Sequence, residues 1–412
     1  MSVIVQKYGG TSVAGPDRLR VVARRVAGAR AAGADLVVVV SAMGQTTDDL
    51  LTLAHQVSAR PSRRELDMLL TAGERVAMSL LAMALHDLGV EAISFTGSQS
   101  GILTDGAHSA ARILEVKPDR IRAELARGRV VIVAGFQGVD PKTKEITTLG
   151  RGGSDTTAVA VAAALAPATC EIYTDVSGVF TADPRIVPDA RGIDELGYSS
   201  CSVLAHLGGR VLHGRCVDLA ARHRVPIVVR SSFDERPGTR IVEDPAMEGT
   251  RVLAVTHRGD CAIALAEGNP GGRGEARGVI EAVAEAVPGL ELVAHEQEAG
   301  GHTAVVWVGS PADAATLEAE FRTLRGPGGE WKIAVEQGAA FVSVVGLGLG
   351  APEVVRAEAA LERARVPLVA LRATPVALIF RVAAQHAEQA VRAVHGAFFP
   401  GEREGQAAGV SS

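Results

Sequence analysis

The sequence predicts an α/β protein in which a mostly parallel sheet lies between helices and is followed by two smaller α/β units. In the first half of the chain, short apolar runs alternate with helical stretches, and parallel strands need such helical crossovers. A stretch rich in Pro, Gly and charge at residues 234–249 marks a domain boundary. Beyond that boundary, one order of strands and helices is repeated twice.

Six apolar runs of the first half have the length and residue types of strands buried on both faces. The expected strands span residues 3–6, 35–41, 92–95, 130–134, 171–174 and 226–229, and the expected helices include 18–32, 65–88 and 111–127. Ligands bind on such sheets beyond the carboxyl ends of the strands, where Lys7, Ser41 and Thr174 fall.

The second half reads as two βαββαβ units. In the first unit, strands are expected at 252–256, 291–294 and 303–308, with helices at 276–286 and 312–324. In the second unit, strands are expected at 341–346, 368–372 and 376–381, with helices at 354–364 and 387–398. The expected domains are therefore 1–245, 250–328 and 333–400, followed by a flexible tail at 401–412.

The composition excludes several classes of protein. Hydrophobic residues make up 47% of the 412 residues, which suffices for two or three cores. A net charge of −5 argues against general nucleic-acid binding. Apolar runs stay below the roughly 18 residues of a membrane span, and the N-terminus enters a strand at once, so neither a membrane segment nor a signal peptide is expected. The four cysteines have no metal or disulfide spacing and are expected to be reduced and buried in a cytoplasmic protein.

A glycine-rich segment at residues 149–157, Leu-Gly-Arg-Gly-Gly-Ser-Asp-Thr-Thr, stands directly before an apolar helical run. Glycines let the backbone approach a ligand closely. Ser154 or Asp155 is placed to cap the helix, whose first amides favour an anion. Arg151 adds a cation that binds a carboxylate or phosphate with two hydrogen bonds. A plain glycine turn before a capped helix is the alternative.

A second segment, Lys-Tyr-Gly-Gly-Thr-Ser-Val at residues 7–13, follows the first predicted strand. A strand that enters such a turn is typical of a loop around phosphates. Lys7 is one of only five lysines among 42 Lys and Arg residues, and a Lys in this place can meet a transferring phosphoryl group. The alternative is a surface Lys before a turn.

Together these segments resemble the aspartate kinases of the amino acid kinase family. The resemblance covers about residues 2–242 and includes Tyr-Thr-Asp-Val at 173–176 and Phe-Thr-Ala-Asp-Pro-Arg at 180–185. Further matching runs lie at residues 40–44, 71–74, 135–138, 229–233 and 237–239. The resemblance implies the amino acid kinase fold, and the two βαββαβ units resemble a tandem pair of ACT domains.

The resemblance also implies roles for the residues. Lys7 would stabilise the moving phosphoryl group, and Asp155 would orient Lys7 or the substrate. Arg151 would bind a substrate carboxylate and Glu74 the substrate ammonium, with Ser41, Thr47 and Ser154 as further contacts. MgATP would be held without a dedicated protein metal site, by Lys7, Gly9, Gly10, Thr11, Ser12, Thr174, Asp175, Phe180, Asp183, Arg185 and Arg210.

The chain departs from the family pattern in several places. Arg210 stands where the family usually has a Lys, Phe180 where it has a Tyr, and Ser98 where it has a Trp. The runs that commonly carry effector contacts in the ACT units are replaced, for example by Leu-Arg-Ala-Thr-Pro-Val-Ala at residues 371–377. Weak or absent inhibition by lysine and threonine is therefore expected.

The expected activity is ATP-dependent phosphorylation of L-aspartate to 4-phospho-L-aspartate, the first step toward lysine, threonine and methionine. The alternatives are a kinase for another acidic amino acid or an aspartate analogue in a secondary pathway, and a weakly active regulatory subunit that contains ACT domains. A homodimer or larger oligomer through the ACT-like half is expected, and Met247 could start a separate small subunit. No nucleic-acid or membrane partner is expected.

Overall fold

A computed structural model describes residues 3–209, 211–244, 250–268, 273–287, 290–297, 303–321 and 331–400. The chain divides into two compact units, each described here by itself. The first comprises Met1–Thr181 and Arg191–Glu248, and the second comprises Ala182–Ala190 and Gly249–Ser412. The predicted flexible tail at 401–412 and the possible start at Met247 lie outside the described residues.

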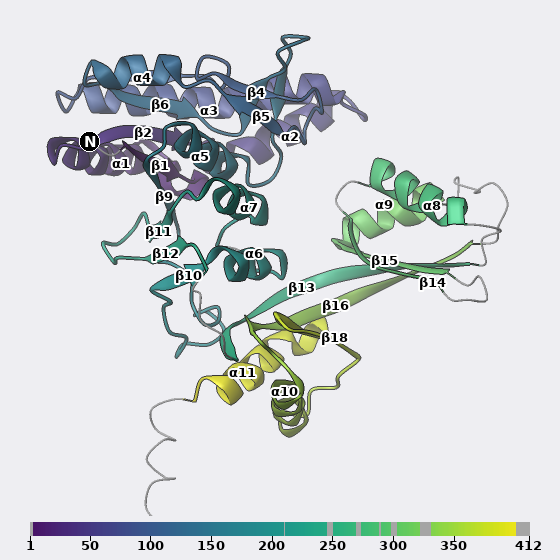
Figure 1. Ribbon diagram of the computed structural model, residues 1–412. Helices are drawn as coiled ribbons and strands as arrows, with labels where there is room; N and C mark the ends of the chain where they lie inside the picture. The colour runs from purple at the N-terminus through teal and green to yellow at the C-terminus, as the bar shows by residue number, and fades with distance from the viewer. Residues whose placement is uncertain are drawn as a thin grey trace, which may run out of the picture. The chain divides into compact units, whose positions relative to one another are not determined.

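The first unit is built on an eight-stranded sheet with the order β10-β12-β11-β9-β1-β2-β6-β3 (Figure 1). Every neighbouring pair is parallel except β11 with β12. The predicted, mostly parallel sheet is therefore confirmed. Its strands are β1 (Val3–Tyr8), β2 (Asp35–Val40), β3 (Ala92–Phe95), β6 (Val130–Ala134), β9 (Ala168–Thr174), β10 (Glu195–Gly197), β11 (Ile227–Ser231) and β12 (Thr239–Val242).

Helices cover both faces of the central strands. On one face, α1 (Pro16–Ala31) and α3 (Arg63–His86) bury Val22, Val26, Leu81 and Leu85 against Tyr8 and its neighbours. Successive residues of a strand point to opposite faces, so Lys7 points to the other face, where α5 (Gly153–Ala164) contacts β1, β2 and β9. The other helices of this unit are α2 (Thr46–Val57), α4 (Asp119–Ala126), α6 (Tyr198–His206) and α7 (Gly214–His223).

The carboxyl ends of β9, β1 and β2 meet at one edge of the sheet because these neighbouring strands run parallel. Backbone hydrogen bonds join the residues that follow these strand ends. The Gly9 amide donates to the Tyr173 carbonyl at 3.3 Å, and the Ser41 amide donates to the Tyr8 carbonyl at 3.2 Å. Lys7, Ser41 and Thr174 are thus brought to the same edge, as the sequence predicts.

A second, four-stranded sheet has the order β5-β4-β7-β8 and was not expected. Its strands are β4 (Ile102–Thr104), β5 (Ile113–Val116), β7 (Gln137–Val139) and β8 (Ile146–Thr148). The helix predicted over 111–127 is wrong in its first half, which forms β5. Pro118 explains the difference, since it disfavours helical backbone at Lys117 and caps the shorter helix α4.

The second unit has one six-stranded sheet with the order β14-β15-β13-β16-β18-β17, antiparallel throughout. Figure 1 shows β13 and β16 as two long strands with α8 and α9 at one end and α10 and α11 at the other. Its elements are β13 (Arg251–Gly268), α8 (Arg273–Ala286), β14 (Glu291–Gln297), β15 (Thr303–Gly309), α9 (Pro311–Phe321), β16 (Trp331–Leu347), α10 (Ala351–Arg363), β17 (Ala370–Thr374), β18 (Ala377–Ala383) and α11 (Ala387–Phe398).

The structure divides this half of the chain differently from the predicted domains 250–328 and 333–400. Residues 262–268 of β13 pair with β15 and with the start of β16, whereas residues 251–258 pair with the end of β16. Each long strand therefore serves both βαββαβ units. The register of β13 shifts between Arg258 and Cys261, near Asp260 at φ 50°, which marks a β-bulge. The strand predicted to end at residue 256 therefore continues through this bulge.

The boundary predicted at residue 245 also needs a correction, because Ala182–Ala190 belongs to the second unit. Ile186 and Val187 are buried there beside Val342 and Phe380, and Arg392 donates to the Ile186 carbonyl at 3.5 Å. Along the sequence, this segment lies inside the first unit, but it packs in the core of the second unit. A composition shift cannot reveal such an excursion.

Among the described helices, α3 reaches the length and apolar content of a membrane span, and half of that window is buried inside the protein. Its apolar side chains Leu81 and Leu85 pack in the core of the first unit. It also carries the buried acids Asp67 and Glu74. The cysteines Cys170, Cys201, Cys216 and Cys261 are free and buried, as predicted.

Candidate active site

Lys7 and Asp155 form the centre of the candidate site. Lys7 is the last but one residue of β1, and Asp155 lies in the first turn of α5. The Lys7 Nζ lies 2.6 Å from the Asp155 Oδ1, with 11% and 13% of the two side chains exposed. A nearly buried lysine aimed by a carboxylate forms a fixed positive charge at the end of the central strand.

Glycines make room for this pair. A side chain at Gly9 would come within 3.3 Å of the Lys7 Nζ. The helix α5 begins after Gly152, which adopts φ 68° and is the N-cap. The expectation that Ser154 or Asp155 caps the helix is therefore wrong. Asp155 lies three residues after Gly152, within the first turn of the helix, where the positive end of the helix dipole stabilises its charge.

The loop after β1 forms a short 3-10 helix, η1 (Gly10–Val13). Its Ser12 hydroxyl donates to Ser232 Oγ at 2.9 Å, and its amide donates to the Gly9 carbonyl. Ser12 is buried, so both of its donors serve the fold and its predicted phosphate contact loses support. Thr11 is exposed, and a side chain at Gly10 would come within 3.1 Å of the Ala42 carbonyl. The Gly9 amide is likewise engaged by Tyr173.

Glu74 of α3 is buried, with 3% of its surface exposed. One carboxylate oxygen accepts the Ala42 amide at 3.0 Å, and the other has no hydrogen-bond partner among the described residues. Burial raises the pKa of this carboxyl to about 7. An unpartnered buried oxygen of this kind costs free energy, so it is a strong candidate for binding a substrate cation.

Arg151 is exposed in the loop between β8 and α5. Its neighbours Gly150 and Gly152 adopt φ 73° and 68°, which only glycine adopts readily. A side chain at Gly150 would come within 2.9 Å of the Ser109 carbonyl. The loop is therefore held closely by its surroundings, while the guanidinium extends from it without an ion pair among the described residues.

The other predicted substrate contacts lie around the same loops. Ser41 follows β2 and Thr47 lies in the first turn of α2, both half-buried. Ser154 is buried beneath Gly135, where an added side chain would come within 2.8 Å of it. The structure does not assign a ligand to any of these three hydroxyls.

The predicted nucleotide residues are divided between the two units. Thr174 ends β9 and donates to Asp175 at 3.0 Å, and Phe180 pairs with Gly192. Asp183 and Arg185 belong to the second unit, where the guanidinium binds both carboxylate oxygens and holds the pKa of Asp183 below its usual range. Arg210 lies outside the described residues.

Two residues near the site were not predicted. Asp67 is a buried carboxylate on α3, seven residues before Glu74. Arg215 of α7 donates to the Leu149 and Ala111 carbonyls at 2.8 and 2.6 Å. Asp67 and Glu74 are seven residues apart and therefore lie on one face of α3, among apolar neighbours. This spacing is the signal that could have revealed Asp67.

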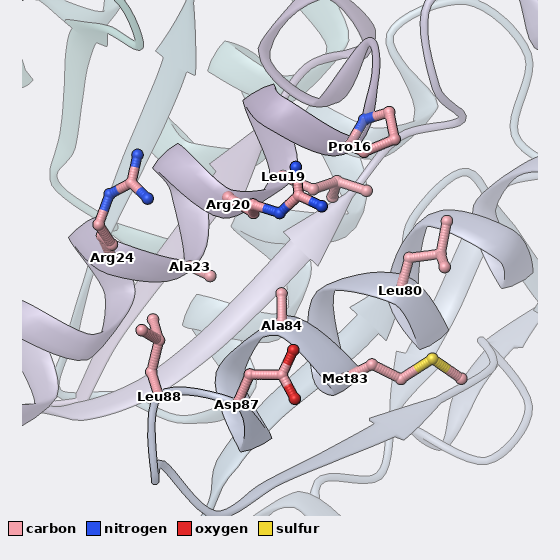
Figure 2. Close-up of a pocket in the computed structure, with 10 residues that line it drawn as sticks. All are labelled: Pro16, Leu19, Arg20, Ala23, Arg24, Leu80, Met83, Ala84, Asp87 and Leu88. Atoms are coloured by element: carbon pink, nitrogen blue, oxygen red, sulfur yellow. The ribbon is translucent and has the colours of Figure 1, made fainter.

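A cavity of about 280 Å³ lies between α1 and α3, on the other side of the sheet from Lys7. Figure 2 shows Leu19, Leu80 and Met83 among the apolar side chains that line it. None of the predicted site residues contributes to this lining. The cavity is therefore a packing feature between two helices and is distinct from the site around Lys7.

The described residues contain no group of three or more His, Cys, Asp or Glu that could hold a metal ion. Magnesium is usually bound by phosphates with only one or two carboxylates.

Comparisons with known proteins agree with this arrangement. The model of the amino acid kinase family matches residues 2–231. The aspartokinase of Mycolicibacterium smegmatis is 54% identical over 296 residues, which are 71% of this chain and 70% of that protein. The aspartokinase of Corynebacterium glutamicum is 41% identical over 406 residues, 97% and 96% of the two chains.

A solved structure gives the same result. E. coli aspartokinase III in complex with aspartate and ADP is 25% identical to this chain and has a TM-score of 0.75, with 97% of this chain and 100% of that chain covered. Because the family model matches more than half of the sequence, and relatives over 40% identical span nearly all of it, this chain belongs to the amino acid kinase family.

Proposed function

We propose that this chain is an aspartate kinase, which transfers the γ-phosphoryl group of ATP to the side-chain carboxylate of L-aspartate. The observation that carries the proposal is the Lys7–Asp155 pair at 2.6 Å, at the edge where β9, β1 and β2 end. The aspartokinase relatives are 41–54% identical to this chain, and one related structure holds aspartate and ADP.

The reaction needs positioning and charge stabilisation more than proton transfer. A carboxylate oxygen of aspartate attacks the γ-phosphorus, and the bond from that phosphorus to the bridging oxygen of ADP breaks. The carboxylate is already ionised near pH 7 because its ordinary pKa is about 3.9, so no general base is required. Lys7 stabilises the negative charge on the transferring group, and Asp155 holds the Lys7 ammonium in place.

The two charged ends of the amino acid meet groups of opposite charge. The unpartnered Glu74 oxygen accepts a hydrogen bond from the substrate ammonium. This contact would replace the hydrogen bonds to water that the carboxylate loses on burial. The exposed Arg151 guanidinium binds the α-carboxylate with two hydrogen bonds. Ser41, Thr47 and Ser154 are further contacts in this proposal.

The nucleotide is proposed to lie over the same edge of the sheet. Thr11, Gly10, Thr174 and Asp175 are proposed to surround it, and magnesium bound with the nucleotide would offset the charge of its phosphates. Phe180, Asp183, Arg185 and Arg210 are retained as proposed nucleotide contacts. Gly9 and Ser12 act through the backbone that they hold in place.

The place of the reaction in metabolism is part of the proposal. The product would enter the synthesis of lysine, threonine and methionine in the cytoplasm. An assembly through the six-stranded sheet of the second unit, with or without a small subunit that starts at Met247, is also proposed. One gel of protein expressed from the native gene distinguishes the two forms, because a small subunit adds a second band.

The proposed activity is tested by ADP release across acidic substrates. ADP should form with ATP only when aspartate is present, and hydroxylamine should trap the acyl phosphate as a hydroxamate. Glutamate in place of aspartate should give little product. A preference for another acidic amino acid would replace the substrate in this proposal, and ADP release that ignores every amino acid would refute it.

A further inference from the structure

The strongest unassigned feature is the Asp67 carboxylate of α3. It is completely buried, and a buried charge persists only with partners that satisfy it. It lies seven residues, or two helical turns, before Glu74 on the same helix. One helix therefore carries both the proposed ammonium-binding acid and a second acid that faces a different set of groups.

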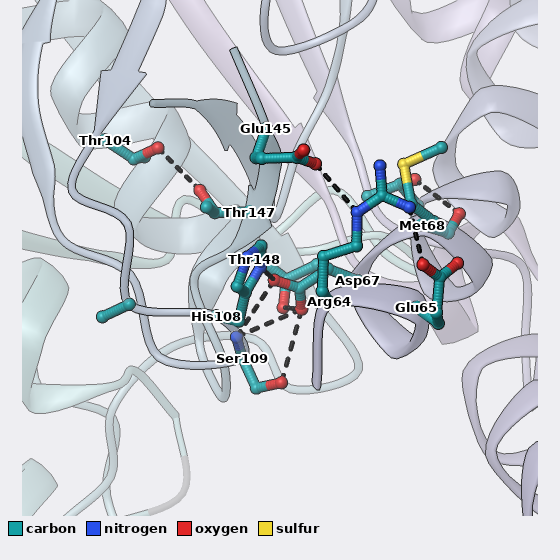
Figure 3. Close-up of polar contacts among 12 residues, drawn as sticks. Arg64, Glu65, Asp67, Met68, Thr104, His108, Ser109, Glu145, Thr147 and Thr148 are labelled. Carbon is teal, nitrogen blue, oxygen red and sulfur yellow. Dashed lines mark hydrogen bonds and ion pairs between the residues drawn. The ribbon is translucent and has the colours of Figure 1, made fainter. Parts of the chain in front are cut away.

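Asp67 accepts hydrogen bonds from the turn at His108 and Ser109 and from the end of strand β8 (Figure 3). The Thr148 hydroxyl donates to it at 2.5 Å, the Ser109 amide at 3.1 Å, and the His108 Nδ1 lies 2.8 Å from its Oδ2. The Ser109 hydroxyl adds a longer contact at 3.4 Å. Ser109 adopts φ 68°, an uncommon backbone for a residue other than glycine. The carboxylate thus fixes a strained turn to the end of β8.

The end of β8 leads directly to Arg151, and the turn at Ser109 lies against the same loop. Thr148 ends β8, three residues before Arg151. The Ser109 carbonyl lies where a side chain at Gly150 would reach it at 2.9 Å. The Ala111 amide donates to the Thr148 carbonyl at 2.9 Å, and the Arg215 guanidinium donates to the carbonyls of both Leu149 and Ala111. The backbone before Arg151 is therefore held through Asp67.

We propose that Asp67 is a positioning residue for the amino acid substrate. It contacts no part of the proposed substrate site itself. Because α3 carries both Asp67 and Glu74, the Asp67 hydrogen bonds fix the Arg151 loop to the helix that holds Glu74. They thereby set the distance between the two charges that bind the ends of the zwitterion. This inference rests on the proposed function of Arg151 and Glu74.

The test compares Asp67→Asn with the parent enzyme. The amide keeps the shape but presents an NH₂ group to donors, so the turn at Ser109 should loosen. We expect the KM for aspartate to rise by about tenfold or more, since a misplacement near 1 Å costs up to about 100-fold. The KM for ATP should stay within a factor of about two, because Lys7 is held by Asp155 and not by this loop.

Two control variants separate positioning from stability. Glu124→Gln breaks another buried acid with two Arg partners, on α4, away from the site. Arg64→Ala removes an exposed ion pair between α3 and Glu145, the residue before β8 (Figure 3). Both should leave the KM for aspartate unchanged, even where the melting temperature falls. A rise in that KM in proportion to lost stability would overturn the proposal.

A second measurement does not depend on activity. Amide hydrogen exchange at residues 105–111 and 149–153, without substrate, should be faster in Asp67→Asn and unchanged in both controls. Should Asp67→Asn fail to fold, Thr148→Val removes a single donor and should show the same effects to a smaller degree. Faster exchange with an unchanged KM would overturn the positioning role. Parent enzyme that releases no ADP with aspartate would instead refute the proposed function.

Discussion

Replacing Glu74 by Gln should make the free protein more stable and the enzyme worse. The structural cause is the burial of a carboxyl that has one amide donor and one oxygen without a partner. Burial raises the pKa of Glu74 from 4.5 to about 7. Gln keeps the shape and can still accept the Ala42 amide, but it carries no charge.

The sign of the stability effect follows from proton binding. Between pH 4.5 and about 7 the folded state keeps the Glu74 proton while the unfolded chain has lost it, so the stability of the folded protein falls as pH rises through this window. The difference between 4.5 and about 7 corresponds to at most about 3 kcal/mol. Glu74→Gln should remove this loss, so its advantage should grow from near zero at low pH to that limit above about pH 7.

Substrate binding should respond in the opposite direction. The ammonium of aspartate pairs with the ionised carboxylate, so the parent KM for aspartate should rise as pH falls below about 7. In Glu74→Gln that KM should be about 10- to 100-fold higher near pH 8, since a hydrogen bond to a charged group usually contributes that much to affinity. The KM of this variant should not change with pH. Urea unfolding and initial rates across the same pH range measure both effects. A variant that is less stable at pH 8 and binds aspartate normally would refute this reasoning.

The remaining predictions concern the charges, the core and regulation. Lys7→Ala should lower kcat by about 100- to 1,000-fold with a much smaller change in the KM for ATP; a kcat near the parent value would remove Lys7 from the mechanism. Arg151→Ala should raise the KM for aspartate by about 10- to 100-fold, and a rise in the KM for ATP instead would assign Arg151 to the nucleotide. Leu81→Ala should cost about 2–5 kcal/mol in urea unfolding with kcat retained, whereas a loss below about 1 kcal/mol would contradict the burial of Leu81. Millimolar lysine plus threonine should change the initial rate little, because apolar residues cannot pair the charges of an amino acid; strong inhibition would show that effector contacts survive elsewhere.

Much of the first unit could be predicted because its signals are local. The strands around Val5, Val38 and Ile132 are short apolar runs with helices between them, and their parallel order brings Lys7, Ser41 and Thr174 to one edge. The glycines around Arg151 predict a tight loop from residue type alone. Even here, the predicted helix over residues 111–127 begins only after Pro118, which is the N-cap of α4.

What could not be predicted depends on contacts between distant residues. The Ser12 hydroxyl is engaged by Ser232, 220 residues away along the chain. The burial of Glu74 depends on the close approach of α3 to the loop after β2, where a side chain at Gly73 would come within 2.7 Å of Ala42. The long strands β13 and β16 join the two βαββαβ units of the six-stranded sheet, because their two ends pair with different strands. No local pattern carries such information.

The central claim is tested most directly by one coupled assay on the purified full-length chain. ATP and magnesium are supplied with hydroxylamine, and ADP and hydroxamate are measured with aspartate, with glutamate and with no amino acid. The account predicts equal amounts of ADP and aspartyl hydroxamate with aspartate, and formation of both products about 100- to 1,000-fold more slowly in Lys7→Ala. ADP release that is independent of aspartate, or hydroxamate formation that survives Lys7→Ala at the parent rate, would contradict it.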